Sequence, residues 1–235
     1  MEPLEWSIAM NSVRRDGEWL RAMRQSAPNA MNTIDQVIDY IASYPYPTVG
    51  TPGENMNYCN EGYAILSYVV DQVAGMPLEQ FCMECIFCPL GMTLTVMDDD
   101  CAAAQAMSGG NITSLFERDD DGALLCDDNW SILPPFRGCA MVKSMARDIA
   151  VYYRCLSNGG MHEGRQVLPR AAVDALNGPS IPATEIACYG LGLYKRVKCG
   201  HVICEHSGGL HGVSTKGGLL LEEGWGRGFV QPGRR

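Results

Sequence analysis

Positive charge is scarce in this sequence of 235 residues, which holds 18 lysines and arginines against 27 aspartates and glutamates. The formal net charge is -9 at pH 7, and no run of basic residues is longer than a pair. A protein that binds a phosphate backbone needs a concentrated positive surface, because its basic side chains replace condensed counterions. The charge balance therefore excludes nucleic acid as a partner.

Long apolar runs are missing as well. No stretch approaches the roughly 18 apolar residues of a transmembrane helix, and the start MEPLEWSIAM has neither the basic region nor the apolar core of an export signal. Hydrophobic residues make up 46% of the sequence and charged residues 19%, a balance typical of a soluble globular protein. We therefore expect no membrane segment and a cytoplasmic location.

Cysteine is abundant, with eleven residues, but an odd number in a large chain without an export signal indicates reduced thiols. Cys82, Cys85 and Cys88 are spaced like part of an iron-sulfur ligand run. A ferredoxin run has a fourth cysteine before its proline, whereas Pro89 directly follows the third cysteine here. The acidic runs at 98–100 and 118–122 lack the spaced ligands of a calcium loop. We expect no metal and no other cofactor.

The stretch YCNEGYAILSYVVDQVAG, residues 58–75, predicts a helix. Asn60 suits the N-cap, and Gly75 stands where a left-handed C-terminal residue belongs. Apolar residues at helical spacing predict one buried stripe: Ile65, Val69 and Val73, with Leu66 and Val70 beside it. A helix start explains Asn60 but assigns nothing to Tyr58.

The remaining pattern predicts an α+β protein. Helices are expected over residues 15–25, 32–44, 60–74 and 77–87. Residues 98–137 are acidic and irregular, which indicates surface loops with room for a short hairpin. A helix capped by Ser144 should end at SNGG, and a short one should follow Pro169. From residue 186 short β-branched and aromatic segments with glycine at the joints predict an antiparallel meander.

Several segments, taken in order, resemble the beta-lactamase-related serine hydrolases, which include class C beta-lactamases, D-alanyl-D-alanine carboxypeptidases and esterases. The segments are TPGENMNYCNEGYAILSYVVDQVAGMPLEQF, PLGMTLT, GCAMVKSMARDIAVYYRCLSNGG, YGLGL and HSGGLHG. The similarity runs from about residue 46 to 222, while 1–31 and 223–235 stay unassigned. The resemblance implies one partial domain over 1–235, of the beta-lactamase/transpeptidase-like α+β fold, incomplete at both ends. The glycine- and arginine-rich tail is not expected to form a strand.

The resemblance also implies a site. The family has a Ser-x-x-Lys on a helix, a Tyr-x-Asn on a loop and a Lys-Thr-Gly or His-Ser/Thr-Gly on a strand. Tyr58-Cys59-Asn60 matches the second element and His206-Ser207-Gly208 the third. By the resemblance, Tyr58, Asn60 and His206 are catalytic, with Tyr58 as the acid/base, and Ser207, Gly208 and Gly209 bind the substrate. The N–H of Gly209 would belong to an oxyanion hole.

Simpler interpretations exist for each motif taken alone. A tyrosine before a helix cap is more often a packing residue, and an isolated His-Ser-Gly-Gly is more often a turn between strands. A phenol with a pKa of about 10 can act as a base only where nearby cations lower that pKa. The ordered series of segments favours the catalytic interpretation. It predicts that Tyr58 and His206 point into one cleft, with polar atoms roughly 3 to 6 Å apart.

The first family element, the nucleophile, is absent from the sequence. The lysines are Lys143, Lys195, Lys198 and Lys216, and none follows a serine by three residues. The serines that come nearest to this motif are Ser12 with Arg15, Ser214 with Lys216, and Ser207. Ser12 lies too near the Tyr-x-Asn motif and has an arginine in place of the lysine, and the other two lie on the strand side of the site. The resemblance implies a serine hydrolase that cleaves amide or ester bonds in a small-molecule or peptide substrate, such as a beta-lactam, a muropeptide or an ester. We expect this chain to be inactive itself, because the nucleophile segment is absent. The alternative is a non-catalytic binding or regulatory relative that retains the cleft.

Overall fold

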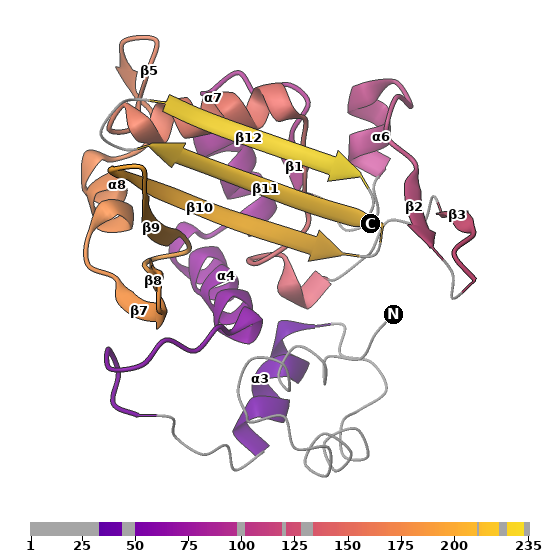
Figure 1. The fold of residues 1–235 in the computed structure, drawn as a ribbon. Coiled ribbons are helices and arrows are strands. Elements are labelled where there is room, and N and C mark those ends of the chain that lie inside the picture. Colours follow the sequence, from indigo (N-terminus) through magenta and orange to yellow (C-terminus); the bar gives the residue numbers. More distant parts are fainter. Residues whose placement is uncertain are drawn as a thin grey trace. The chain divides into compact units, whose positions relative to one another are not determined.

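The computed structural model describes residues 33–43, 50–97, 102–118, 121–127, 134–210, 212–220 and 225–232. The chain divides into two compact units (Figure 1). We call them the helical unit, Met1–Phe81 with Ile132–Val142, and the sheet unit, Cys82–Ser131 with Lys143–Arg235. The single domain expected from the sequence stays a prediction.

The helical unit contains α3 (Ile34–Ser43), α4 (Asn60–Ala74), most of α5 (Leu78–Cys82) and the 3-10 helix η2 (Pro134–Phe136). The helices expected over 32–44 and 60–74 are confirmed. The helix expected over 15–25 lies outside the described residues. Val37 and Tyr40 of α3 are buried.

The N-cap of helix α4 lies one residue earlier in the chain than the sequence predicted. Cys59 is the N-cap: its backbone is extended, and its Sγ accepts a hydrogen bond from the Gly62 N–H at 3.3 Å. Asn60 is therefore the first helical residue, and its expected role as the cap is wrong. The left-handed end at Gly75 is confirmed, with φ of 68°.

The buried face of α4 also differs from the expected stripe. The buried residues are Glu61, Ala64 and Ser67, whereas Leu66, Val69 and Val73 are 54%, 46% and 83% exposed. The reason is a close approach of backbone to the small-residue side of the helix. A Cβ at Gly138 would lie 2.9 Å from the Ser67 Cβ and closer still to the Tyr63 carbonyl oxygen. Only small residues on α4 and a glycine opposite allow this packing.

One arginine joins the end of α4 to α5. Arg137 forms ion pairs with Asp71 on α4 and, through Nη1 at 3.2 Å, with Glu79 Oε1 on α5. The other oxygen of Asp71 accepts a hydrogen bond from the Leu78 N–H at 2.7 Å. The two ion pairs and this hydrogen bond hold the turn between α4 and α5 in place.

The sheet unit is built on a six-stranded antiparallel sheet in the order β12-β11-β10-β9-β8-β7. The strands are β7 (Ile181–Thr184), β8 (Ala187–Tyr189), β9 (Tyr194–Lys198), β10 (His201–Leu210), β11 (Val213–Leu220) and β12 (Trp225–Pro232). The expected meander and the α+β class are confirmed.

The expectation for the C-terminal tail is wrong. Strand β12 pairs with β11 from Val213 opposite Pro232 to Leu220 opposite Trp225. Antiparallel pairing uses backbone N–H and C=O groups, so a glycine-rich segment can add to a sheet without an alternating apolar pattern. The apolar pattern alone therefore could not predict this strand.

Helices α7 (Ala146–Ser157) and α8 (Arg170–Asn177) pack on this sheet (Figure 1). Their shared core contains Leu156, Val173, Cys204 and Leu219. The N-cap of α7 is Met145, so the capping role expected for Ser144 is wrong. The Ser144 hydroxyl instead lies 2.6 Å from the Thr95 hydroxyl. The helix ends at SNGG and the short helix follows Pro169, as expected.

A second core cluster in the sheet unit contains Phe87, Leu90, Met92 and Cys155. The helix expected over 77–87 is formed by α5 and, from Met83 to Phe87, by the π-helix η1. The segment is therefore helical as predicted, but its second half is a π-helix, which is wider than an α-helix. Asp148 of α7, itself buried, accepts hydrogen bonds from the Leu94 N–H at 2.8 Å and the Thr95 hydroxyl at 2.9 Å.

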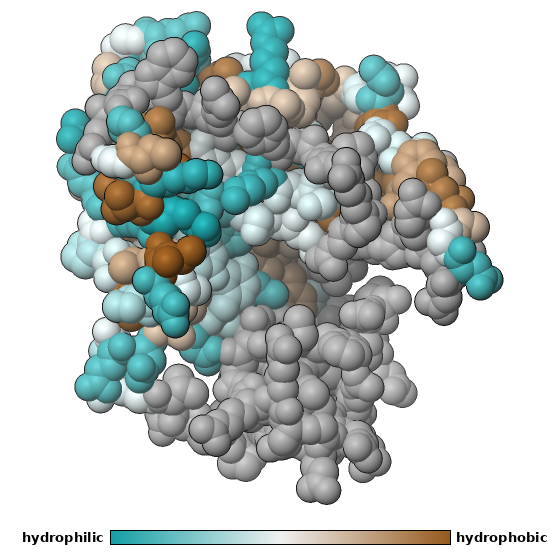
Figure 2. All heavy atoms as spheres, viewed as in Figure 1, coloured by the Kyte–Doolittle hydropathy of each residue, from teal (hydrophilic) through white to brown (hydrophobic). Residues whose placement is uncertain are grey.

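The acidic region 98–137 contains the expected hairpin, formed by β2 (Leu115–Arg118) and β3 (Leu124–Asp127). It also contains α6 (Ala102–Ser108), which was not predicted. The hairpin exposes Leu124 and Leu125, and apolar residues are visible on that side of the sheet unit (Figure 2). Short two-residue strands complete the unit: β1 (Val96–Met97), β4 (Val142–Lys143, which starts in the helical unit), β5 (Met161–His162) and β6 (Arg165–Gln166).

The described part of the chain lacks disulfides, metal-ligand clusters and membrane-spanning helices. No disulfide joins any of the ten cysteines in this part of the chain. No group of three histidine, cysteine or acidic side chains there could hold a metal ion. No described helix has both the length and the apolar character needed to span a bilayer.

We predict that Gly217→Ala destabilises the sheet unit. A Cβ at this position would lie 2.6 to 2.7 Å from ring carbons of Tyr153, so α7 would have to move away from β11. The expected loss is about 1–3 kcal/mol of unfolding free energy, measured by urea denaturation with circular dichroism. Gly190→Ala is the control, because the new Cβ would lie 3.4 Å from the end of the Lys195 side chain and 3.7 Å from the Leu176 carbonyl oxygen, both without a clash. Equal stability of both variants would contradict the prediction.

Candidate functional site

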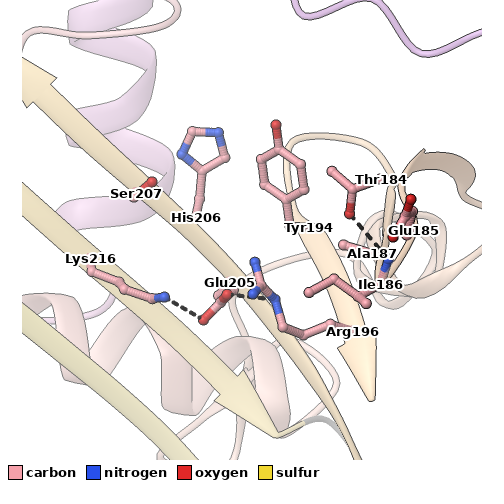
Figure 3. Close-up of a pocket in the computed structure, with 10 residues that line it drawn as sticks. All are labelled: Thr184, Glu185, Ile186, Ala187, Tyr194, Arg196, Glu205, His206, Ser207 and Lys216. Atoms are coloured by element: carbon pink, nitrogen blue, oxygen red, sulfur yellow. Dashed lines mark hydrogen bonds and ion pairs between the residues drawn. The ribbon is translucent and has the colours of Figure 1, made fainter. Parts of the chain in front are cut away.

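A pocket of about 610 Å³ opens in the sheet unit beside the strands that carry the His-Ser-Gly motif (Figure 3). Strands β9, β10 and β11 line it, together with the turn between β7 and β8 and the strand residues on either side of that turn. The lining residues are Thr184, Glu185, Ile186, Ala187, Tyr194, Arg196, Glu205, His206, Ser207 and Lys216. Two of the residues singled out from the sequence, His206 and Ser207, thus lie together at one pocket.

The motif lies inside strand β10 and not in a turn. In the register with β11, Ser207 stands opposite Lys216 and Gly208 opposite Thr215. A Cβ at Gly208 would lie 2.8 Å from the Thr215 hydroxyl oxygen, so the glycine keeps this part of the ladder close. Gly208 and Gly209 are exposed, which leaves the backbone at the end of the motif open to a ligand.

His206 lies against two tyrosine rings. Its ring centroid is 5.9 Å from that of Tyr194 and 6.2 Å from that of Tyr189. Burial lowers the pKa of His206 below its usual 6.5, and a backbone hydrogen bond at Ser207 opposes that effect. The imidazole is therefore neutral at pH 7, with one nitrogen able to donate a hydrogen bond and one able to accept.

Glu205 pairs with both cations of this pocket. Its Oε1 lies 2.8 Å from Arg196 Nε on β9, and its Oε2 lies 3.1 Å from Lys216 Nζ on β11 (Figure 3). The Arg196 contact is an ion pair without an aligned Nε–H hydrogen bond. Sequence reasoning did not identify Arg196 and Glu205, and it considered Lys216 only beside Ser214, because only the register of β9, β10 and β11 brings the three residues together.

The Tyr-x-Asn motif lies in the helical unit, with Tyr58 and Asn60 both half-buried. Between them, Cys59 lies with its Sγ 3.4 Å from Glu61 Oε2. Glu61 is buried, and its Oε1 has no hydrogen-bond partner. The motif therefore precedes a helix whose first turn buries a carboxylate.

Neither thiol beside this carboxylate is activated. Burial, followed by the charges of Glu61 and Cys59, raises the pKa of Cys139 to about 12. Burial is also the main cause that raises the pKa of Cys59. A thiol that stays protonated at neutral pH is a poor nucleophile, so these cysteines do not replace the missing serine.

The motifs fall in different units: Tyr58 and Asn60 in the helical unit, His206 to Gly209 in the sheet unit. The expected meeting of Tyr58 and His206 in one cleft stays a prediction. Of the serines that come nearest to the nucleophile motif, Ser12 lies outside the described residues. Ser214 lies on β11 opposite Gly209.

Comparison with known proteins gives a family and a fold. The model of the Beta-lactamase family matches residues 13–230. No curated protein matches the sequence. Many solved structures are similar to this chain in structure.

The penicillin-binding protein homologue from Pyrococcus abyssi has a TM-score of 0.70 and 19% identity, over 88% of this chain and 46% of that one. The D-stereospecific amidohydrolase from Streptomyces sp. has a TM-score of 0.70 and 20% identity, and the match covers 98% of this chain and 66% of that one. The D-amino acid amidase from Ochrobactrum anthropi SV3, complexed with D-phenylalanine, has a TM-score of 0.65 and 18% identity, and the match covers 88% of this chain and 59% of that one. At these identities the likeness establishes the fold. This chain spans about half to two thirds of their length.

We predict that His206 titrates below pH 6.5 in the folded protein, because burial disfavours the imidazolium. Well above pH 6.5 the imidazole is neutral in both the folded and the unfolded state, so its titration does not change stability. As the pH falls from there through the folded pKa, the unfolded chain takes up its proton first, so stability is lost. Histidine NMR titration, and unfolding of the wild type and His206→Gln against pH, measure the two effects. A midpoint at or above 6.5 would show the prediction to be wrong.

Proposed function

The chain belongs to the beta-lactamase family, and from this membership we propose that its sheet unit carries the strand side of an acyl-transfer site for amide or ester bonds. The resemblance drawn from the ordered sequence segments is thereby confirmed, as is the beta-lactamase/transpeptidase-like fold. The activity, the substrate and the residue roles below are part of the proposal.

One observation carries the proposal: His206-Ser207-Gly208 occupies a strand that lines a pocket. A neutral histidine and an exposed serine hydroxyl stand there side by side, both able to donate and accept hydrogen bonds to an amide or ester group. The open backbone at Gly209 offers an N–H to a developing oxyanion. These groups orient an acyl group and stabilise charge, but they do not supply a nucleophile.

The helical unit carries the Tyr-x-Asn element, and the roles proposed for Tyr58 and Asn60 follow from the family resemblance. In acyl transfer one group takes the nucleophile's proton and returns a proton to the leaving group. We assign this role to the Tyr58 phenol and a hydrogen-bonding role toward the substrate to Asn60. The assignment requires a nearby cation to lower the phenol pKa, and in the family that cation belongs to the nucleophile segment.

The nucleophile is the element that this sequence does not contain, since none of its lysines follows a serine by three residues. Ser207 does stand opposite Lys216. However, the Lys216 ammonium is engaged by the Glu205 carboxylate at 3.1 Å, and an ammonium offers no lone pair to take the Ser207 proton. We therefore propose that these 235 residues form no acyl-enzyme by themselves.

The proposed substrates are small amides or esters of amino-acid type. The pocket of about 610 Å³ suits one side chain and its acyl group, and one structural relative is an amidase complexed with D-phenylalanine. Beta-lactams and muropeptides are substrates of the same bond classes, and a panel of all three separates them.

A non-catalytic binding role is the second candidate, and the missing Ser-x-x-Lys favours it. Genomic sequence upstream of Met1 discriminates the two. An in-frame Ser-x-x-Lys helix there supports the hydrolase, and a protein that starts at Met1 supports the binding role.

We predict that this chain is not labelled by a fluorescent penicillin or a fluorophosphonate. After incubation and a denaturing gel, the folded chain should show no band above a heat-unfolded control, because its sequence holds no Ser-x-x-Lys. A stoichiometric band mapped to Ser12, Ser207 or Ser214 would overturn the proposed absence of a nucleophile.

The site assignment has its own test in an extended chain that includes an upstream Ser-x-x-Lys segment. That protein should be labelled, and Tyr58→Phe should slow labelling by about 10²–10⁴-fold, the usual contribution of a general acid/base. His206→Gln is the second variant. Undiminished labelling of both variants would sink the assignment of Tyr58 and His206.

A further inference from the structure

The two cations of the sheet-unit pocket share one carboxylate. Glu205 Oε1 pairs with Arg196 Nε at 2.8 Å, and Glu205 Oε2 pairs with Lys216 Nζ at 3.1 Å. Each oxygen thus takes one partner, from the strand on each side of β10 (Figure 3). A residue without a side chain, Gly218, stands opposite Glu205 on β11. A Cβ at Gly218 would lie 3.1 Å from the Glu205 Cβ, so the glycine leaves room for the glutamate on the β11 side.

The three side chains are unequally exposed. Glu205 is 12% exposed, Arg196 35% and Lys216 57%. The carboxylate is therefore held below the pocket surface, while the lysine ammonium reaches toward solvent. Lys216 also stands opposite Ser207, beside the hydroxyl that the proposed function assigns to substrate binding.

We propose that Glu205 is a specificity-determining residue of this pocket. By holding both cations, it disfavours ligands that place a carboxylate beside Ser207 and directs the pocket toward uncharged amides and esters. The inference rests on the proposed function, because it concerns the ligands of that same site.

The electrostatic argument concerns what an incoming anion meets. A carboxylate that approaches Lys216 has to displace Glu205 from the ammonium or bind within reach of its negative charge, and both options reduce the attraction. An uncharged amide meets neither cost. Loss of the Glu205 charge would release both cations. Lys216 is the more exposed of the two and therefore the one that an incoming carboxylate reaches more easily.

The test compares two ligands that differ only in this charge, N-acetyl-D-phenylalanine and N-acetyl-D-phenylalaninamide. Dissociation constants are measured at low ionic strength by NMR shifts of the Ser207 and Lys216 amides, so no catalysis is needed. The wild type should bind the amide more tightly than the acid. Glu205→Gln should improve binding of the acid about fivefold, the factor that a strong exposed ion pair contributes, and leave the amide within twofold.

Two further variants separate the clamp from general charge. Glu185→Gln makes the same change in net charge at the same pocket, but Glu185 is exposed on the β7–β8 turn, so binding of the acid should change less than twofold. Adding Lys216→Gln to Glu205→Gln should cancel the gain, because it removes the released ammonium.

Each outcome decides a different point. If the amide binds but Glu205→Gln leaves the preference unchanged, or Glu185→Gln shifts it equally, the inference is wrong and the proposed function stands. If neither ligand binds to any variant, the pocket is no substrate site and both fail. Should Glu205→Gln not fold, Lys216→Gln alone decides: the inference expects binding of the acid to stay within twofold, and a fivefold loss overturns it.

Discussion

The register of β10 with its two neighbours is the constraint on which the candidate site depends. A shift of one residue would turn every side chain of the strand to the other face of the sheet. In the observed register Ser207 meets Lys216 on β11, and Glu205 meets Tyr194 on β9. The same register brings His206 beside Tyr194 and gives Glu205 its two cations. The pocket, its charges and its neutral histidine are all consequences of these two strand pairings.

Helix α7 keeps that pairing in place from behind. Tyr153 of α7 lies on the backbone of β11 at Gly217, the residue opposite His206. Leu156 of the same helix joins Cys204 and Leu219 of the sheet in the core. The helix, in turn, is tied at its start by the buried Asp148, which accepts hydrogen bonds from Leu94 and Thr95. Contacts on the covered face thus hold the residues that line the pocket.

Local signals were sufficient for most elements. Gly75 and the SNGG segment marked helix ends because a left-handed residue is readily recognised in a sequence. The buried side of α4 could not be predicted, because it was chosen by the close approach of Gly138, 74 residues after Ala64, against small side chains. Strand β12 escaped prediction because its pairing uses the backbone. In the site, the motif residues were identifiable by resemblance, whereas Arg196, Glu205 and Lys216 form a cluster only through long-range pairing.

The contacts of Arg137 have a consequence for the order of synthesis. Its partners Asp71 and Glu79 precede it by 66 and 58 residues, and about fifty residues of the sheet unit are made in between. During translation α4 and α5 leave the ribosome well before the arginine that joins them, and Gly138, which packs on α4, is made just after it. Until then the two carboxylates lack their ion-pair partner, and Gly138 cannot pack on α4. The helical unit can therefore complete its packing only after residues 82–131 of the sheet unit have been synthesised.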